Sequence, residues 1–356
     1  MNTKLLDLYS DYLISSFRKT TATGLSELLD GELSHDQITR WLRQKAGTSS
    51  DLWQMVKPDV RQIESTEGLL ILDDSIEEKP YTDENDQICW HYDHSKERYV
   101  KGINFLTSLS SSQGLGLPVG FHLITKTEEH VDAKTGKIKH QSLQTKNELY
   151  RDLVKQAVKN QIQFRYVIND IWYASAENMQ FVKQEQSKDF VMPLKDNRKT
   201  ASTQEEKKQG KYVQLKSLKL EAGQVREIYL EGVEFSLSLL KKVFINEDGS
   251  EGVLYLVTSD KSKDYEEITA IYQKRWKVEE YHKSLKQNVS LSMSPTQRIN
   301  GQTNHFFAAL WGYIKLELLK FQSQQNHFAL KSKLYIQALR QSFATWQSMK
   351  QLQTSA

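Results

Sequence analysis

Residues 68–74 read GLLILDD and residues 164–170 read FRYVIND, so two short apolar runs each end in aspartate. An apolar run of this length is typical of a strand that is buried on both faces. Further strand-like patterns lie at residues 99–111, 116–126 and 189–194, and helical patterns lie at residues 143–160 and 172–184. The order strand, strand, strand, helix, strand, helix, strand is that of an RNase H-like fold. We therefore predict an α/β protein with a mixed five-stranded sheet and flanking helices.

Changes of pattern divide the rest of the chain. Residues 195–258 contain alternating segments that predict a β-rich insertion with its own small antiparallel sheet. Residues 305–321 are largely apolar and are predicted to be core, whereas residues 328–350 look amphipathic and either join two copies or pack on their own chain. The predicted regions are a helical DNA-binding region (1–62), the first part of the core (63–194), the insertion (195–258), the second part of the core (259–320) and a helical C-terminal region (321–356).

The N-terminal region contains a possible helix-turn-helix at residues 23–45. A turn is predicted at Asp30 and Gly31, and Ser34 with Gln37 forms the pattern of a capping box at the start of the second helix. Any two short helices joined by a glycine turn share this pattern, so DNA contact here is a hypothesis. Its candidate DNA-facing residues are His35, Gln37, Arg40 and Arg43.

The composition excludes several classes of protein. The single cysteine, Cys89, excludes an internal disulfide and a Cys-rich zinc site, so we expect carboxylates to bind any metal. The longest apolar candidate, residues 306–314, ends at Lys315 and falls short of the ~20 residues that cross a bilayer. The first residues lack the features of a secretory signal. We therefore expect a cytoplasmic protein without a membrane partner.

Charge is uneven along the chain, although its formal net value is only +3. Residues 195–226 hold nine Lys or Arg against four Asp or Glu. This window is either a solvated loop or a phosphate-binding surface, and the sequence leaves both interpretations open.

Residues 272–286 read YQKRWKVEEYHKSLK and contain neither proline nor glycine, so we predict one continuous helix. At ~100° per residue, one face of this helix carries Glu279 among cations. Glu279 and Lys283 form an ordinary i,i+4 pair, but such a pair does not account for the other residues of the face. These are Tyr272, Arg275 and Lys286, flanked by Trp276 and His282.

The spacing of Tyr272, Arg275, Glu279 and Lys286 resembles the Y-R-E-K signature of a large group of bacterial insertion-sequence DDE transposases, which includes the Tn-five transposase. The resemblance covers about residues 68–320. It implies cut-and-paste transposition, in which a homodimer cleaves DNA at the terminal inverted repeats of the transposon and transfers the strands into target DNA. It also implies association with the nucleoid when the protein is bound to DNA.

The resemblance further implies two earlier aspartates at strand ends. Family members usually show Asp, a variable residue and then Thr or Ser at the first position, which favours Asp73, with Asp74 as the alternative. The second is Asp170, which is followed by an aromatic pair. The implied catalytic carboxylates Asp73, Asp170 and Glu279 would hold two Mg²⁺ ions ~3.5–4 Å apart, with Mn²⁺ as a substitute. The implied DNA contacts are Tyr272, Arg275, Trp276, His282, Lys283 and Lys286.

In the Tn-five type, a Trp of the insertion stacks on a flipped base while a DNA hairpin forms. Residues 195–258 contain no Trp, so a hairpin intermediate requires another aromatic residue. The candidates are Tyr229, Phe235 and Phe244.

Two other functions remain open from the sequence. An inactive or domesticated relative would bind DNA as a repressor without cutting it, and another RNase H-like nuclease would act on a different substrate. Binding of the terminal repeats distinguishes a transposase from such a nuclease.

Overall fold

The computed structural model describes residues 2–94, 96–131, 136, 138–246 and 248–354. The remaining positions, which include the ends of the predicted N- and C-terminal regions, lie outside the described residues. The chain divides into two compact units. The first unit holds Met1–Leu52, Glu77–Gly102 and Glu280–Ala356, and the second unit holds Trp53–Ile76 and Ile103–Glu279.

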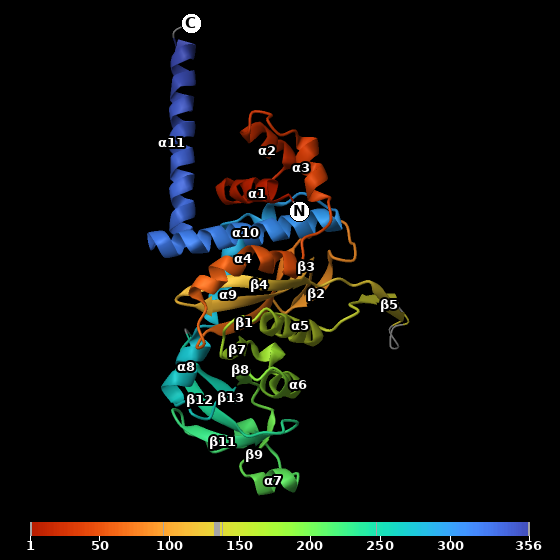
Figure 1. Cartoon of the computed structure of the whole chain (residues 1–356), viewed down its shortest axis with the longest axis vertical. Helices are drawn as coiled ribbons and strands as arrows, with labels where there is room; N and C mark the ends of the chain where they lie inside the picture. The colour runs from red at the N-terminus through yellow and green to blue at the C-terminus, as the bar shows by residue number, and fades with distance from the viewer. Residues whose placement is uncertain (1, 95, 132–135, 137, 247, 355–356) are drawn as a thin grey trace. The chain divides into compact units, whose positions relative to one another are not determined.

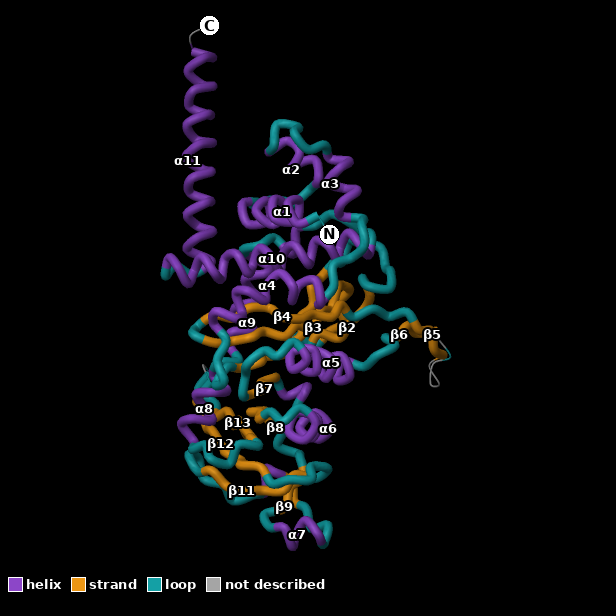
Figure 2. Tube along the Cα trace, in the orientation of Figure 1, coloured by secondary structure: helices purple, strands orange, loops and turns teal. Residues whose placement is uncertain are grey.

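A large mixed sheet dominates the second unit, and its strands follow one another from β4 to β11 in Figure 2. The strand order is β10-β9-β11-β12-β13-β8-β7-β1-β3-β2, with β4 paired to β3. Pairs β1–β7 and β7–β8 are parallel, whereas β3–β4 and β8–β13 are antiparallel. The strands are β1 (Leu69–Glu78), β2 (Cys89–Asp93), β3 (Arg98–Ser112), β4 (Leu115–Leu123), β7 (Tyr166–Asn169), β8 (Asp189–Leu194), β9 (Lys199–Ala201), β10 (Val213–Gln214), β11 (Val225–Leu230), β12 (Leu237–Ile245) and β13 (Glu251–Thr258), with a separate hairpin of β5 (Glu128–Val131) and β6 (Ile138–Gln141).

The predicted mixed α/β class is confirmed, but the sheet is larger than the five strands expected. The insertion does not form its own small sheet, because β13 pairs with β8 along Tyr255–Leu194 to Thr258–Val191. This pairing satisfies the backbone hydrogen bonds at the edge of β8, which would otherwise be an open sheet edge. The strands of the insertion therefore extend the central sheet.

Helices of the second unit pack against this sheet. Helix α5 starts at a capping box formed by Thr145 and Glu148, and it lies against β4. The approach is close, since a Cβ at Gly120 would lie 2.9 Å from a methyl carbon of Leu153. The helices are α5 (Lys146–Lys159), η1 (Ile171–Tyr173), α6 (Ala176–Gln180), η2 (Phe181–Glu185), α7 (Gln204–Lys208), η3 (Leu215–Ser217) and α8 (Tyr265–Gln273), while α4 (Ser49–Ile63) and α9 (Trp276–Gln287) each have residues in both units.

The first unit is mainly helical, with β2 paired to the first part of β3. Its helices are α1 (Thr3–Ser15), α2 (Ala22–Leu28), α3 (His35–Leu42), η4 (Leu291–Met293), α10 (Ile299–Ser323) and α11 (His327–Thr354). Helix α10 is largely buried, which confirms the predicted core segment. The Asn304 amide of α10 donates to the Leu42 carbonyl of α3 at 2.9 Å. The predicted capping box of Ser34 and Gln37 is also confirmed.

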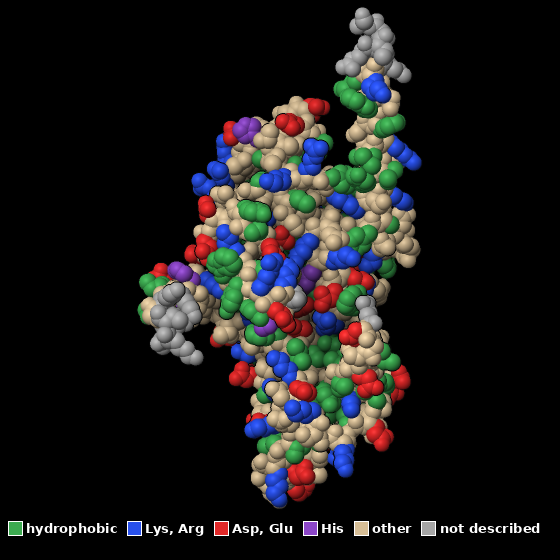
Figure 3. Space-filling view, turned by 180° about the vertical axis from the view of Figure 1, so that it is seen from behind, with side chains coloured by type: hydrophobic (Ala, Val, Ile, Leu, Met, Phe, Trp, Pro, Cys, Tyr) green, Lys and Arg blue, Asp and Glu red, His purple; other side chains and the backbone are tan. Residues whose placement is uncertain are grey.

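Helix α11 starts against α10 and then extends away from it, as Figure 1 shows. Its later turns carry large apolar side chains that are between 41% and 65% exposed. These side chains are Leu334, Tyr335, Ile336, Leu339, Phe343, Trp346 and Met349, and some appear as green patches along this helix in Figure 3. Within the described part of the chain, no helix combines the length and the apolar character that crossing a membrane requires.

Candidate functional site

Two aspartates meet because the parallel strands β1 and β7 run in register. Leu72 of β1 lies opposite Asn169 of β7. Asp73 directly follows Leu72, and Asp170 directly follows Asn169. The sequence predicted that β1 ends at its acidic residues, which is wrong, because β1 continues to Glu78. Its parallel pairing with β7, however, ends at Leu72. Asp73 is therefore the first residue beyond the parallel pairing and lies within a continuous strand.

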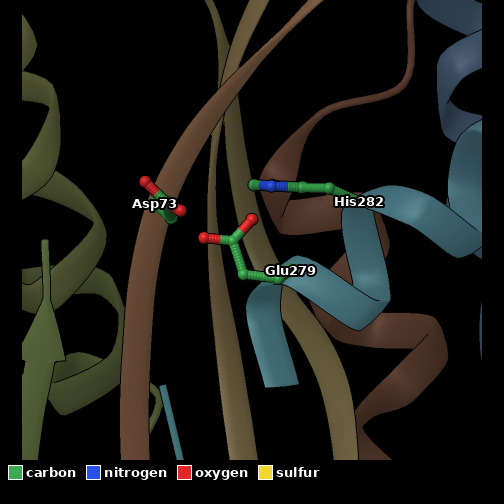
Figure 4. Close-up of side chains that lie close together, drawn as sticks. All are labelled: Asp73, Glu279 and His282. Atoms are coloured by element: carbon green, nitrogen blue, oxygen red, sulfur yellow. The ribbon is translucent and has the colours of Figure 1, made fainter. Parts of the chain in front are cut away.

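Helix α9 brings a third carboxylate to this point. Ligand oxygens of Asp73 and Glu279 lie within 4.8 Å of one another. Figure 4 shows the Glu279 carboxylate extending from α9 toward Asp73 on β1. Between them, the Arg275 guanidinium donates to Glu279 at 3.1 Å and lies 3.8 Å from an oxygen of Asp73. The arrangement is a pair of facing carboxylates with one cation beside them.

Asp170 lies next to this pair, but its carboxylate is turned toward its own loop. Oδ1 of Asp170 accepts hydrogen bonds from the amides of Trp172 (3.0 Å) and Tyr173 (3.4 Å), so Asp170 caps the short helix η1. Ligand atoms of Asp73 and Glu279 belong to one cluster, in which all lie within 4.8 Å of one another. Among the described residues, Asp170 is not a member of this cluster. The structure thus brings two of the three predicted carboxylates together and holds the third beside them.

The electrostatics of the aspartates are unfavourable for their ionised forms. Burial raises the pKa of Asp73 well above its usual value, and the neighbouring charges of Asp170 and Asp74 raise it further. Arg275 acts in the opposite direction but does not outweigh these effects. Burial also raises the pKa of Asp170, and the charge of Asp74 adds to it. Acidic groups with raised pKa values in one cluster are a common feature of functional sites.

Asp74 has a different environment, because successive side chains of a strand point to opposite sides. Its Oδ2 accepts from the Lys146 ammonium at 2.6 Å, and its Oδ1 accepts from the Tyr173 hydroxyl at 2.6 Å. The ring of Tyr173 stacks on Tyr150, whose hydroxyl donates to Asn169 at the end of β7. A cation and a hydroxyl therefore satisfy Asp74, which the sequence left open as an alternative to Asp73.

Lys146 was not among the predicted functional residues. It lies 72 positions from Asp74 in sequence, and no local pattern connects the two. Only the packing of α5 beside β1 and β7 creates their contact.

The single helix predicted for residues 272–286 is wrong. Helix α8 ends at Gln273, and α9 begins at Trp276. The amides of Lys274 and Arg275 bond to carbonyls three residues earlier, so the chain tightens into a short turn between the two helices. The turn keeps Tyr272 beside Arg275, whose guanidinium lies 6.0 Å from the centre of the tyrosine ring.

A hollow of about 340 Å³ in the second unit adjoins Tyr272 and Arg275. Its walls come from β12, β13, α8 and the start of α9. Two of its aromatic residues are well exposed, Phe244 at 43% and Trp276 at 64%. Of the three aromatic residues suggested for base stacking, Phe244 lines this hollow. Tyr229 lies under the Lys207 ammonium, and Phe235 packs near Phe190.

The remaining predicted DNA contacts of α9 have other neighbours. His282 is buried and lies three residues after Glu279 on α9. The Lys283 ammonium lies over the ring of Phe328, so the expected pairing of Glu279 with Lys283 gives way to pairing with Arg275. Burial lowers the pKa of Lys286, and the charge of Glu77 partly offsets this effect.

Arg40 and Arg43, the predicted DNA contacts of the N-terminal region, are exposed on and directly after α3 in the first unit. Their exposure is compatible with the predicted role, which stays a prediction.

Two family models each match more than half of the chain. One, described as a transposase DDE domain, matches residues 130–314, and the other, described as a DDE superfamily endonuclease, matches residues 2–216. The chain belongs to the DDE transposase family. Together the two matches of this transposase span Asp73, Asp170 and Glu279.

No curated protein matches the transposase. Among solved structures, the Drosophila P element transposase strand transfer complex is similar at 11% sequence identity with a TM-score of 0.26. The similarity covers 52% of the present chain and 36% of the P element transposase chain. The present chain therefore spans little more than a third of the length of the P element protein.

Proposed function

We propose that this transposase cuts DNA at the ends of a transposon and joins the cut ends to target DNA. The observation that carries the proposal is the approach of Asp73 and Glu279, from a central strand and a separate helix, with Asp170 beside them. We further propose that β1, β3, β4, β7 and β8 form an RNase H-like core around these carboxylates, and that the chain is of the Y-R-E-K group. The order of strands along the chain and the parallel pairing of β1, β7 and β8 support this assignment.

The carboxylates fit divalent cations by charge and by chemistry. Asp73 and Asp170 have raised pKa values because burial and the charges of neighbouring aspartates disfavour their ionised forms, and a bound cation would relieve both effects. A site of oxygen ligands suits Mg²⁺ or Mn²⁺. Asp73, Asp170 and Glu279 would hold two such ions. When bound, the ions activate the attacking water or 3′-hydroxyl and stabilise the leaving oxygen of the scissile phosphate.

The protein's own residues prepare the site for this chemistry. Asp170 uses Oδ1 for both bonds to η1, which leaves Oδ2 for a cation. Arg275 holds Glu279 near Asp73 through its guanidinium, and this group would turn to a DNA phosphate once cations neutralise the acids. Tyr272, under the guanidinium, fixes its position.

For a hairpin route, Phe244 is the best candidate among the aromatic residues of the insertion. It is exposed, it lines an apolar hollow, and that hollow also contains Tyr272 and Arg275 of the signature. A flipped base would stack on its ring while the neighbouring cation holds the adjoining phosphate.

We also propose that two copies act together and that α11 contributes to their contact. Its exposed apolar residues recur at spacings of three, four and seven, as in Tyr335, Leu339, Trp346 and Met349. Such spacing suits packing against another helix. Sedimentation of the full chain with and without end DNA tests this part of the proposal.

The decisive experiment is cleavage of a labelled duplex that carries the element's end, in Mg²⁺ or Mn²⁺. We expect metal-dependent nicking by the wild type, loss of nicking in Glu279→Ala with binding retained, and normal nicking in the matched control Glu266→Ala, an exposed acid of α8. Equal activity of the wild type and Glu279→Ala would contradict the site. Binding without cleavage by any of the proteins would instead indicate a DNA-binding repressor.

A further inference from the structure

A second hollow of the second unit lies directly beside the loop that carries Asp170. Its volume is about 240 Å³, and its walls come from η1, the end of β8 and the turn that follows β8. Trp172 of η1 lines it with 46% of the residue exposed. Lys195 and Arg198 line it from the following turn. An exposed aromatic ring therefore shares a hollow with two cations.

The geometry ties this hollow to the candidate metal site. The amide of Trp172 donates to Asp170 at 3.0 Å, so the indole belongs to a residue that the carboxylate itself positions. The amide of Arg198 donates to the carbonyl of Lys195 at 3.1 Å, which closes a turn and brings both cations to one wall. A strand of DNA that reaches Asp170 would pass this hollow.

Within the part of the chain that the structure describes, Lys195 and Arg198 lack acidic partners, unlike Lys199 and Lys146. Among the described residues, no carboxylate lies within ion-pair distance of Lys195 or Arg198. In contrast, Lys199 pairs with Glu231 at 3.5 Å, and Lys146 pairs with Asp74 at 2.6 Å. Unpaired cations beside an exposed indole are an arrangement that suits nucleic acid, since phosphates pair with the cations and bases stack on the ring.

We propose that Trp172, Lys195 and Arg198 form a nucleotide-binding pocket for one base of an unpaired or terminal DNA strand and its flanking phosphates. This inference rests on the proposed function. A base inside an intact duplex is covered on both faces by its neighbours, so the ring of Trp172 takes a base at a cut end or in a locally opened strand. That strand is either the transposon end or the target.

The test uses the full chain with the substitution Glu279→Ala, so that bound DNA is not consumed. A fluorescent adenine analogue whose emission is quenched by stacking is placed at successive positions of the end strand and, separately, of a nicked target strand. We expect quenching at one position in this protein and in a version that also carries Trp172→Phe, and none with Trp172→Ala. Quenching in the end strand assigns the pocket to the transposon end, and quenching in the target strand assigns it to the target.

Affinity gives a second measure. Trp172→Ala should weaken binding of DNA with an unpaired base roughly tenfold to a hundredfold, while fully paired DNA binds as before. Lys195→Ala with Arg198→Ala should lower the slope of log affinity against log salt by about two, because two phosphate contacts are lost. The matched controls are Lys199→Ala, whose cation is already paired, and Trp90→Ala, an exposed indole on β2.

The outcomes separate the two proposals. If the wild-type chain shows no metal-dependent cleavage of end DNA, the proposed function fails and this inference fails with it. If the wild type cleaves, but the Trp172→Ala and the Lys195→Ala, Arg198→Ala proteins bind, quench and transfer strands like the wild type, only the pocket is refuted. Trp172→Phe keeps the ring, so its normal behaviour beside a loss in Trp172→Ala excludes a mere folding defect.

Discussion

Strand β7 has carboxylates at both ends, and their electrostatic states are opposite. At its start, Asp260 accepts from the Tyr166 hydroxyl at 2.6 Å and from the Arg165 guanidinium at 2.8 Å. Burial alone would raise the pKa of Asp260, but these bonds and those from Ser262 bring it to about 2. At its end, burial and the charge of Asp74 raise the pKa of Asp170. The pKa of Asp73, beside it, is raised well above its usual value.

The difference teaches how to separate a structural acid from a functional one at the two ends of one strand. Arg165 and Tyr166 stabilise Asp260 in its ionised form, so Asp260 contributes to the stability of the fold. Asp73 and Asp170 lie in an acidic group in which the guanidinium of Arg275 is the charge that lowers their pKa values, and it does not outweigh burial and the neighbouring acids. A group of acids that the fold leaves under repulsion is poised to bind a cation from outside.

The largest expected effect compares the two ends directly. Asp73→Asn should lower the rate of DNA cleavage roughly a thousandfold or more, because it removes an anionic ligand at the reacting centre. Asp260→Asn should change the rate by less than about threefold at a temperature where the protein stays folded. Single-turnover cleavage of an end duplex measures both, and equal losses in the two variants would end the distinction.

A smaller effect is expected on the other side of β1. Asp74→Asn or Lys146→Met should lower cleavage by about 10–100-fold, since these residues support the strand without binding the ions. Tyr173→Phe should fall in the same range, because it removes one of the two bonds to Asp74. The assay is cleavage as a function of Mg²⁺ concentration. A loss in Asp74→Asn as large as that in Asp73→Asn would instead make Asp74 the ligand.

The stability of the chain should depend on Asp260 in a way that changes with pH. At neutral pH, Asp260→Asn should lower the free energy of unfolding by about 2 kcal/mol, since Arg165 and Tyr166 lose a charged acceptor. The pKa of Asp260 in the folded protein, about 2, lies below the ordinary value of 3.8, so this stabilisation is present above about pH 4 and is lost as the pH falls toward 2. Urea unfolding at several pH values measures it, and a pH-independent difference would contradict the assignment.

The smallest expected effect has the opposite sign. Because the pKa of Asp73 is raised in the folded protein, the protein loses stability as the pH rises above the ordinary pKa of this carboxyl. Asp73→Asn should therefore stabilise the metal-free protein at neutral pH. We expect a rise in melting temperature on the order of 2–4 °C. Mg²⁺ should then stabilise the wild type and not the variant. Thermal unfolding with and without Mg²⁺ provides the check, and equal stabilisation of both proteins by Mg²⁺ would count against Asp73 as a ligand.

Several features could be predicted from the sequence because they depend on residues close together in the chain. The capping box of Ser34 and Gln37 is complete within four residues, and the apolar runs before Asp73 and Asp170 mark buried strands. The break between α8 and α9 was missed because nothing in residues 272–286 disfavours a helix. The turn places Arg275 3.8 Å from Asp73, a residue about two hundred positions earlier, which no local pattern encodes.

By itself, the sequence determined the class of fold, the apolar strands that lead to the two aspartates, the helical character around Glu279 and the resemblance to DDE transposases, because periodicity and spacing are local properties. Only the tertiary structure decided which of two adjacent aspartates faces Glu279, that the insertion extends the central sheet, and that Trp172 shares a hollow with Lys195 and Arg198. Each of these depends on pairing or packing between segments far apart in the chain. The partner of Asp74, for example, is set by the docking of α5 and not by any residue near Asp74 itself.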